Sequence, residues 1–301
     1  MTAELALVTR GVTKHYGAVR ALSGLDLRVP AGSIYGLVGR NGAGKTTTLK
    51  TLMGMVRRDG GEILLLGRVV TGEADLVELR RRIGHVGEDR GAWPGLTTDH
   101  VLTVMRPFFP GWREEQTREH LESFQIPRRL PVGRLSKGQR TALALVLALA
   151  RGPDLLLLDE PTDGLDPEMR ERALKAVVSA VGENASLAVV FSSHQLADVE
   201  QIADRVGVIE RGRLVFDESL DELKAGYRRV VATFDGAVPD AVLATPGVRQ
   251  ARAEGRMVSL LVGRDAEDVA ARVRELRARE VEILPASLKD VFLDAARPAD
   301  V

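Results

Sequence analysis

Short apolar runs alternate with segments of helical periodicity along most of the chain. The apolar residues at 33–38 predict a buried strand, which leads through a glycine-rich turn into a predicted helix at 45–55. Four consecutive leucines at 155–158 are too few for a helix and are typical of a parallel strand covered on both faces. Periodicity also predicts strands at 6–12, 21–29 and 187–191, and helices at 136–150 and 167–181. This alternation indicates an α/β fold with a mostly parallel sheet, which places its ligands at the carboxyl ends of the strands.

Two regions depart from this alternation. Residues 93–130 mix proline, tryptophan and charged residues around helical segments such as 114–124, which indicates a helical insertion. After residue 224, predicted strands and one amphipathic helix indicate a small α+β unit, with strands at 230–234, 257–262 and 281–284 and the helix at 267–279. We therefore expect a main domain at 1–223, with a helical subdomain at about 89–150, and an accessory domain at 224–301.

Composition excludes several classes of chemistry. The 301 residues include no cysteine, so disulfides, thiol nucleophiles and thiolate metal sites are absent. Lys plus Arg and Asp plus Glu balance at 42 each, which argues against broad electrostatic binding to nucleic acid. The longest apolar run, 142–150, is far shorter than the roughly 20 residues that span a bilayer. Residues 1–10 show no secretory signal pattern, so we expect a cytoplasmic protein without a membrane span.

Residues 39–46, GRNGAGKT, match the phosphate-binding pattern G-x-x-x-x-G-K-[ST] between the predicted strand and helix that it requires. Glycines in such a loop let successive backbone N–H groups point at phosphate oxygens. We expect Lys45 to reach the terminal phosphates and the Thr46 hydroxyl to bind Mg²⁺. The candidate ATP-binding residues here are Gly39, Arg40, Asn41, Gly42, Ala43, Gly44, Lys45, Thr46 and Thr47. The alternative is a glycine turn followed by an incidental Lys-Thr pair.

Two further segments carry candidate chemistry. The leucine strand ends in two carboxylates, of which Asp159 is expected to organise the Mg²⁺ shell and Glu160 to polarise the attacking water as a general base. A solvated strand end is the structural alternative. Upstream, Ser136 is the predicted N-cap of the helix at 136–150, and together with the Gly138 backbone it forms a second anion site. The chain thus has two candidate phosphate sites, the glycine-rich loop and the start of the helix at 136–150.

The order and spacing of these motifs over residues 5–222 resemble the ATP-binding cassette (ABC) ATPases, because residues 135–140, LSKGQR, are similar to their LSGGQ signature. The resemblance implies a P-loop NTPase fold of the ABC type, with a mixed sheet and a helical subdomain, and ATP and Mg²⁺ as cofactors. It assigns catalysis to Glu160 and to His194, which would orient the attacking water. It assigns further ATP contacts to Tyr16, Ser136, Lys137, Gly138, Gln139 and Asp166. The alternatives are a core tyrosine for Tyr16, an ordinary turn around Asp166 and a structural histidine for His194.

Two positions depart from the family pattern. Glu88 occupies the place of the usual Q-loop glutamine, where a carboxylate can bind Mg²⁺ more strongly than an amide but donates no hydrogen bond. Its neighbour Asp89 belongs to the same segment. Lys137 replaces the second residue of the signature, which is usually glycine. We therefore expect Mg²⁺ ligands at Thr46, Glu88 and Asp159, with altered turnover or coupling.

The segment from Glu88 through Trp93 and the ending PASLKDVFL at 285–293 are similar to ATPase subunits of bacterial ABC-2-type exporters, in the branch associated with acetoin utilisation and antibiotic response. The resemblance implies two ATP-binding subunits that close over ATP, with a homodimer favoured, and separate transmembrane permease subunits. The location implied is the cytoplasmic face of the membrane, without nucleic acid as a partner. We expect the permease to dock near Glu88, in an apolar groove supplied by Trp93, Phe108, Phe109 and Trp112.

Two other functions stay open. A non-transport cassette ATPase acting on DNA, RNA or ribosomes usually has two cassettes or a long coiled-coil insertion, and this chain has neither. A nucleotide sensor that binds ATP but barely hydrolyses it is suggested by Glu88 and Lys137, whereas Glu160 and His194 argue against it. The transported substrate is not encoded in these motifs.

Overall fold

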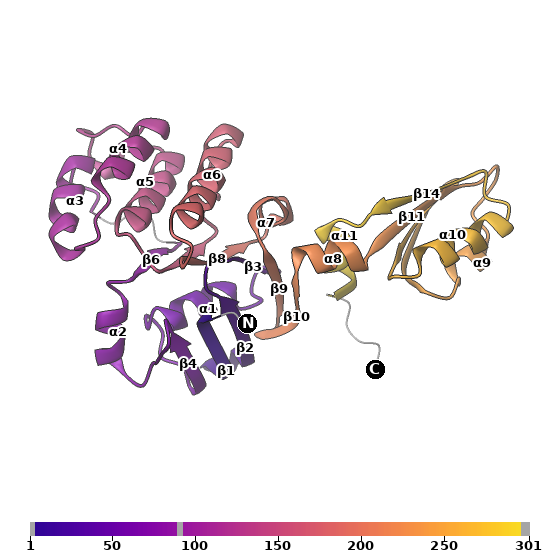
Figure 1. The fold of residues 1–301 in the computed structure, drawn as a ribbon, viewed down its shortest axis with the longest axis horizontal. Helices are drawn as coiled ribbons and strands as arrows, with labels where there is room; N and C mark the ends of the chain where they lie inside the picture. The colour runs from indigo at the N-terminus through magenta and orange to yellow at the C-terminus, as the bar shows by residue number, and fades with distance from the viewer. Residues whose placement is uncertain (1–3, 89–92, 296–301) are drawn as a thin grey trace. The chain divides into compact units, whose positions relative to one another are not determined.

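The computed structural model describes residues 4–88 and 93–295, and the chain divides into two compact units, 1–217 and 218–301 (Figure 1). The division falls within β10 (Arg213–Ser219), slightly before the boundary at residue 224 that the sequence suggested. The short helix α8 (Leu220–Gly226) therefore groups with the second unit. Asp89, the neighbour of Glu88 in the predicted Q-loop segment, lies outside the described residues.

A six-stranded sheet forms the centre of the first unit, in the order β10-β9-β3-β8-β7-β6. Besides β10, its strands are β3 (Ile34–Val38), β6 (Ile83–Val86), β7 (Leu155–Asp159), β8 (Ala188–Ser193) and β9 (Arg205–Glu210). The strands from β9 to β6 pair in parallel. All residues of β3, β7 and β8 are buried, as expected for apolar strands covered on both faces. The predicted parallel sheet is thus confirmed.

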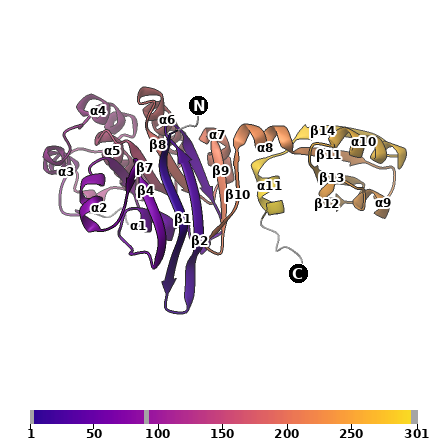
Figure 2. The ribbon, with the colours of Figure 1, turned by 60° about the horizontal axis from the view of Figure 1, so that its bottom comes forward.

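A second, antiparallel sheet with the order β2-β1-β4-β5 packs in the same unit. Its strands are β1 (Leu5–Tyr16), β2 (Val19–Pro30), β4 (Gly60–Leu65) and β5 (Arg68–Val69), and β1 and β2 form the long hairpin seen in Figure 2. One apolar core joins this sheet, through Leu7 and Leu25, to Leu49 of α1 (Lys45–Leu52) and to Leu157 of β7. Helix α2 (Glu73–Leu79) adds Leu76. The hairpin is thereby fixed relative to the phosphate loop.

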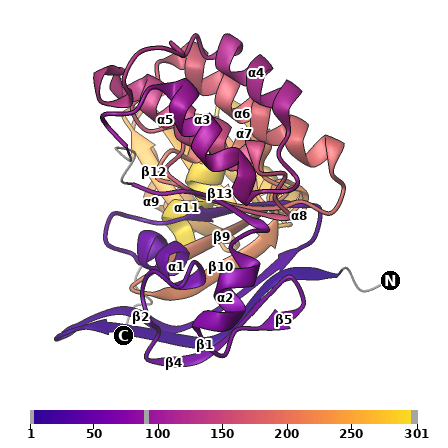
Figure 3. The same ribbon diagram turned by 90° about the vertical axis from the view of Figure 1, so that its left-hand side faces the viewer.

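Helices gather at one side of the first unit (Figures 1 and 3). They are α3 (Thr98–Met105), α4 (Glu114–Ser123), α5 (Lys137–Ala150) and α6 (Pro167–Glu183), with short 3-10 turns at Arg106–Phe108 and Val132–Arg134, and α7 (Leu196–Ile202) follows β8. Ser136 caps α5 as predicted: its hydroxyl accepts a hydrogen bond from the Gln139 N–H at 3.1 Å. Within residues 4–88 and 93–295, no helix combines the length and the apolar character needed to cross a membrane.

The second unit has the order βαββαβ of a split βαβ fold. Its elements are β11 (Arg228–Thr233), α9 (Asp240–Leu243), β12 (Val248–Glu254), β13 (Met257–Val262), α10 (Ala266–Glu275) and β14 (Glu280–Pro285), followed by α11 (Leu288–Ala295). The strands pair antiparallel in the order β12-β13-β11-β14, and Val230, Leu260 and Val273 lie in the core between sheet and helices. Strand β12 was not predicted, because its sequence VRQARAE is mostly polar.

Candidate nucleotide-binding site

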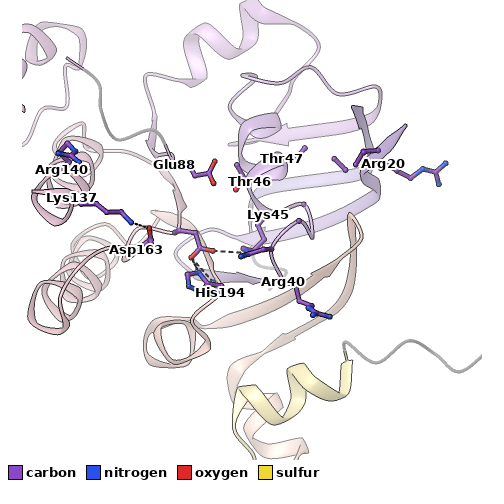
Figure 4. Close-up of a pocket in the computed structure, with 16 residues that line it drawn as sticks. Arg20, Arg40, Lys45, Thr46, Thr47, Glu88, Lys137, Arg140, Asp163 and His194 are labelled. Atoms are coloured by element: carbon purple, nitrogen blue, oxygen red, sulfur yellow. Dashed lines mark hydrogen bonds and ion pairs between the residues drawn. The ribbon is translucent and has the colours of Figure 1, made fainter. Parts of the chain in front are cut away.

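A cavity of about 960 Å³ lies where β3, β7 and β8 end (Figure 4). The predicted residues that line it are Arg40, Asn41, Gly42, Gly44, Lys45, Thr46, Thr47, Glu88, Lys137, Glu160 and His194. Five lining residues were not predicted, namely Val19, Arg20, Ala21, Arg140 and Asp163. Val19 to Ala21 follow Tyr16 at the hairpin, and Arg140 is four residues after Ser136. Their closeness in sequence to these predicted residues is the signal that could have identified them.

The phosphate loop connects β3 to α1, as its sequence predicted. Gly44 precedes the helix with φ +114°, and a Cβ atom there would lie 2.8 Å from the carbonyl oxygen of Ala21. Only glycine fits this position, because its backbone conformation is left-handed and the space beside it is filled. Without a side chain at Gly44, the backbone at this point of the loop can approach a phosphate closely.

Lys45 is buried and bound to the protein on two sides. Its Nζ donates a hydrogen bond to the Gly39 carbonyl at 2.8 Å and lies 3.5 Å from Glu160 Oε1. A buried ammonium needs such partners, because burial without them is costly. Anionic phosphates in the loop would offer Lys45 stronger partners than the carbonyl oxygen does.

Asp159 and Glu160, at the end of β7, have different surroundings. Asp159 is only 1% exposed, and its Oδ1 accepts a hydrogen bond from the Ser192 hydroxyl at 2.6 Å. Glu160 has φ +48°, a conformation that non-glycine residues rarely adopt, and its N–H points to Ser192 O and Oγ, each at 3.2 Å. This turn, held by β8, aims the Glu160 carboxylate into the cavity.

His194 meets Glu160 across the ends of two strands. Its Nδ1 lies 2.7 Å from Glu160 Oε2, and its backbone N–H donates to the same oxygen at 3.2 Å. The carboxylate of Glu160 is thus held between the Lys45 ammonium and the His194 ring. The structure brings together the two residues expected to catalyse hydrolysis and the lysine expected to bind phosphate.

The signature residues divide into two groups. Lys137 lines the cavity and pairs with Asp163 at 2.9 Å, while its side chain lies over the backbone of Gly164. Ser136, Gly138 and Gln139 are not among the residues that line this cavity. Of the residues at the start of α5, Lys137 and Arg140 line the cavity of their own chain, whereas the cap residue Ser136 does not.

The remaining predicted residues lie at or beyond the cavity margin. Glu88 lines the cavity, and its Oε2 is 3.6 Å from Lys50 Nζ. Tyr16 is 48% exposed and lies outside the lining. Asp166 caps α6 by accepting a hydrogen bond from the Met169 N–H at 2.9 Å. In the part of the chain that the structure describes, no three His, Asp or Glu side chains cluster as a self-sufficient metal site.

A groove of about 330 Å³ adjoins the nucleotide cavity at Glu88. Its lining includes Trp93, together with apolar side chains of α3 and α5 such as Val101, Met105, Leu143 and Leu147. The expectation that three further aromatic residues line it is wrong. Phe108 is exposed, Phe109 packs against the Arg151 guanidinium at 4.3 Å, and Trp112 lines a separate cavity, because the 3-10 turn after α3 carries these side chains away.

Comparison with known proteins places this site in a family. Residues 22–163 match the family model described as ABC transporter. The chain is 34% identical to the daunorubicin/doxorubicin resistance ATP-binding protein DrrA of Streptomyces peucetius, over 98% of this chain and 94% of that protein. The bacitracin transport ATP-binding protein BcrA of Bacillus licheniformis is 34% identical over 73% of this chain and 72% of its own length. A solved ATP-binding subunit of an ABC transporter has 26% identity and a TM-score of 0.65, covering 73% of this chain and 92% of that one.

The chain belongs to the ABC transporter ATP-binding proteins. It is an ATP-binding and ATP-hydrolysing transporter subunit. Members of this family act with a second ATP-binding subunit and with transmembrane permease subunits. The family assigned from the motifs is thereby confirmed.

Proposed function

We propose that this chain energises a bacterial ABC-2-type exporter at the cytoplasmic face of the membrane, by closing two copies over ATP and hydrolysing it with Glu160 and His194. The observation that carries the proposal is the meeting of Lys45, Glu160 and His194 beside the phosphate loop, from three segments far apart in sequence. The relatives' names, which concern daunorubicin and doxorubicin resistance and bacitracin transport, support an exporter.

Hydrolysis follows from the contacts of Glu160. Phosphates in the loop draw the Lys45 ammonium away from this carboxylate, which is left with His194 as a partner. Glu160 then accepts a proton from the water that attacks the γ-phosphate. Because Nδ1 of His194 faces Glu160, Nε2 is the ring nitrogen available to the γ-phosphate.

The metal site combines protein oxygens with those of ATP. Thr46 and Glu88 line the cavity, whereas Asp159, buried at the end of β7 next to Glu160, is not among its lining residues. Hydroxyl and carboxylate oxygens are ligands that Mg²⁺ prefers, and this ion usually takes only one or two protein carboxylates besides phosphate and water. These residues therefore fit Mg²⁺, which when bound would neutralise charge on the phosphates.

The start of α5 would bind the nucleotide held by the second copy. Ser136, Gly138 and Gln139 do not line the cavity of their own chain, although a helix start with a capped hydroxyl suits an anion. The Ser136 hydroxyl accepts the Gln139 N–H and can still donate its own proton to a phosphate oxygen. Two identical chains in head-to-tail contact would complete two ATP sites, with Lys137 and Asp166 near the junction.

Tyr16 is the proposed platform for adenine. Its ring is half-exposed, with the Lys14 ammonium 5.5 Å from the ring centroid. Val19, at the other end of the same hairpin turn, lines the cavity. An adenine ring stacked on Tyr16 would therefore leave its phosphates within the cavity.

The groove beside Glu88 is the proposed permease contact. It joins apolar side chains of α3 and α5 to the basic residues Lys50, Arg140 and Arg151. Its volume of about 330 Å³ holds a few side chains of a partner segment. Glu88 lines both the groove and the nucleotide cavity. A movement of the Glu88 side chain can therefore couple the permease contact to the ATP site.

The test compares wild type with Glu160→Gln by steady-state ATP hydrolysis and by light scattering with and without ATP. We expect wild type to hydrolyse ATP, and the variant to lose at least about 100-fold in kcat while it accumulates an ATP-dependent dimer. Glu171→Gln on the exposed face of α6, where Glu171 pairs with Lys175, is the matched control. A wild-type chain that binds ATP but neither hydrolyses it nor dimerises would refute the homodimer mechanism.

A further inference from the structure

Lys50 and Glu88 form an ion pair between the two cavities of the first unit. Lys50 Nζ lies 3.6 Å from Glu88 Oε2, and both side chains are partly exposed to solvent. Glu88 lines the nucleotide cavity and the groove, whereas Lys50 lines the groove. Whatever enters the groove can therefore contact the lysine that holds Glu88.

The position of Lys50 on α1 determines to which side the ion pair draws the Glu88 carboxylate. Lys50 follows Thr46 by four residues in one helix, so both side chains lie on the same face, one turn apart. One helical turn is about 5.4 Å. A carboxylate that pairs with Lys50 is thus drawn along the helix, away from a metal ion that the Thr46 hydroxyl would bind.

Arg140 and Arg151, which also line the groove, contact other groups. Arg140 donates to the carbonyl oxygen of Leu135, and the Arg151 guanidinium lies 4.3 Å from the centroid of the Phe109 ring. Lys50 is therefore the basic residue of the groove placed to compete for Glu88.

We propose that Lys50 is a positioning residue that holds Glu88 away from magnesium, so that metal binding must compete with the Lys50 ammonium. The inference rests on the proposed role of Glu88 as a metal ligand. It depends on the carboxylate that departs from the family pattern, because a neutral glutamine would form no ion pair with Lys50. An anionic side chain placed in the groove by the permease would bind Lys50 and release Glu88.

The test measures how strongly Mg²⁺ supports nucleotide binding by the full chain. The affinity for a fluorescent, non-hydrolysable ATP analogue is measured with saturating Mg²⁺ and with EDTA, and the ratio of the two affinities reports the metal contribution. We expect Lys50→Met to raise this ratio about two- to fivefold, the range for an exposed ion pair. The EDTA measurement accounts for any direct effect of Lys50 on the phosphates.

Matched variants separate the pair from general electrostatics. Glu88→Gln is expected to lower the ratio, and Lys50→Met in the Glu88→Gln background to leave it unchanged. Lys50→Arg should keep the wild-type ratio, since it keeps the charge. Lys175→Met, which removes an exposed lysine that pairs with Glu171 on α6, controls for the loss of one positive charge.

The possible failures are distinguishable. If Glu88→Gln lowers the ratio but Lys50→Met leaves it at the wild-type value, the role of Lys50 is wrong and the metal role of Glu88 stands. An equal rise in the wild-type and Glu88→Gln backgrounds also overturns the role of Lys50, because the effect is then independent of the pair. If Glu88→Gln leaves the ratio unchanged, both proposals about Glu88 are wrong.

Discussion

Replacing Ser192 by alanine tests how β8 holds the catalytic end of β7. The Ser192 hydroxyl is buried, donates to Asp159 Oδ1 at 2.6 Å and accepts from the Glu160 N–H at 3.2 Å. Ser192→Ala removes both contacts and takes a hydrogen bond from a carboxylate that is only 1% exposed. The variant should therefore be less stable and should hold Glu160 less firmly.

The size of the effect follows from the type of bond lost. A hydrogen bond to a charged group contributes about 1.5–3 kcal/mol. For a unit of this size, each kcal/mol shifts the thermal midpoint by about 2–4 °C, so we expect a fall of about 3–12 °C. Both tryptophans, Trp93 and Trp112, lie in the first unit, so their fluorescence follows its unfolding. Misplacement of Glu160 should also lower kcat by roughly tenfold or more.

Ser193 offers a matched control in the next position. Its hydroxyl is equally buried, but among the described residues it bonds to neutral groups of Gln195, donating to the carbonyl at 3.3 Å and accepting from the N–H at 2.9 Å. Ser193→Ala should therefore cost less, about 1 kcal/mol. The reasoning fails if Ser192→Ala has the same midpoint as Ser193→Ala and the kcat of the wild type.

Two further predictions concern the phosphate loop and pH. Gly44→Ala should weaken binding of a fluorescent ATP analogue at least about tenfold, because the left-handed backbone becomes strained and the new Cβ is pressed against the Ala21 carbonyl. Gly11→Ala is the control. Gly11 has φ +58° and open space around it, so this change should lower stability without the loss of affinity. Burial lowers the pKa of His120 below its ordinary 6.5, so the unfolded chain takes up a proton first and stability falls as pH drops below 6.5. Urea unfolding at pH 7.5 and 5.5 should show a smaller loss for His120→Gln than for the wild type, and an equal loss in both would contradict this role of His120.

Local motifs explain why much of the first unit was predictable. The strand, glycine loop and helix around Lys45 follow each other directly, and the capping box between Ser136 and Gln139 spans a single helical turn. In both cases the residues that determine the structure are neighbours in sequence. A continuous apolar strand such as β7 must likewise be covered on both faces, whichever elements of the fold cover it.

Elements that depend on distant partners were harder to predict. Strand β12 is largely polar and lies at the edge of its sheet, so it is identified by pairing with β13 rather than by its own pattern. The groove contains Trp93 but not Phe108, because the course of the chain after α3, rather than the residue type, decides which aromatic side chains face it.

The order of residues along the chain specifies the chemical groups and the loops that carry them: a phosphate loop ending in Lys45, a strand followed by Glu160 and a strand followed by His194. The meeting of these three side chains, with Glu160 between the other two, depends on the three-dimensional fold. The fold also places Glu88 beside Lys50, and it leaves Ser136, Gly138 and Gln139 outside the lining of their own chain's cavity. The physical reason is the parallel sheet, which brings the carboxyl ends of β3, β7 and β8 to one edge although long stretches of chain separate them.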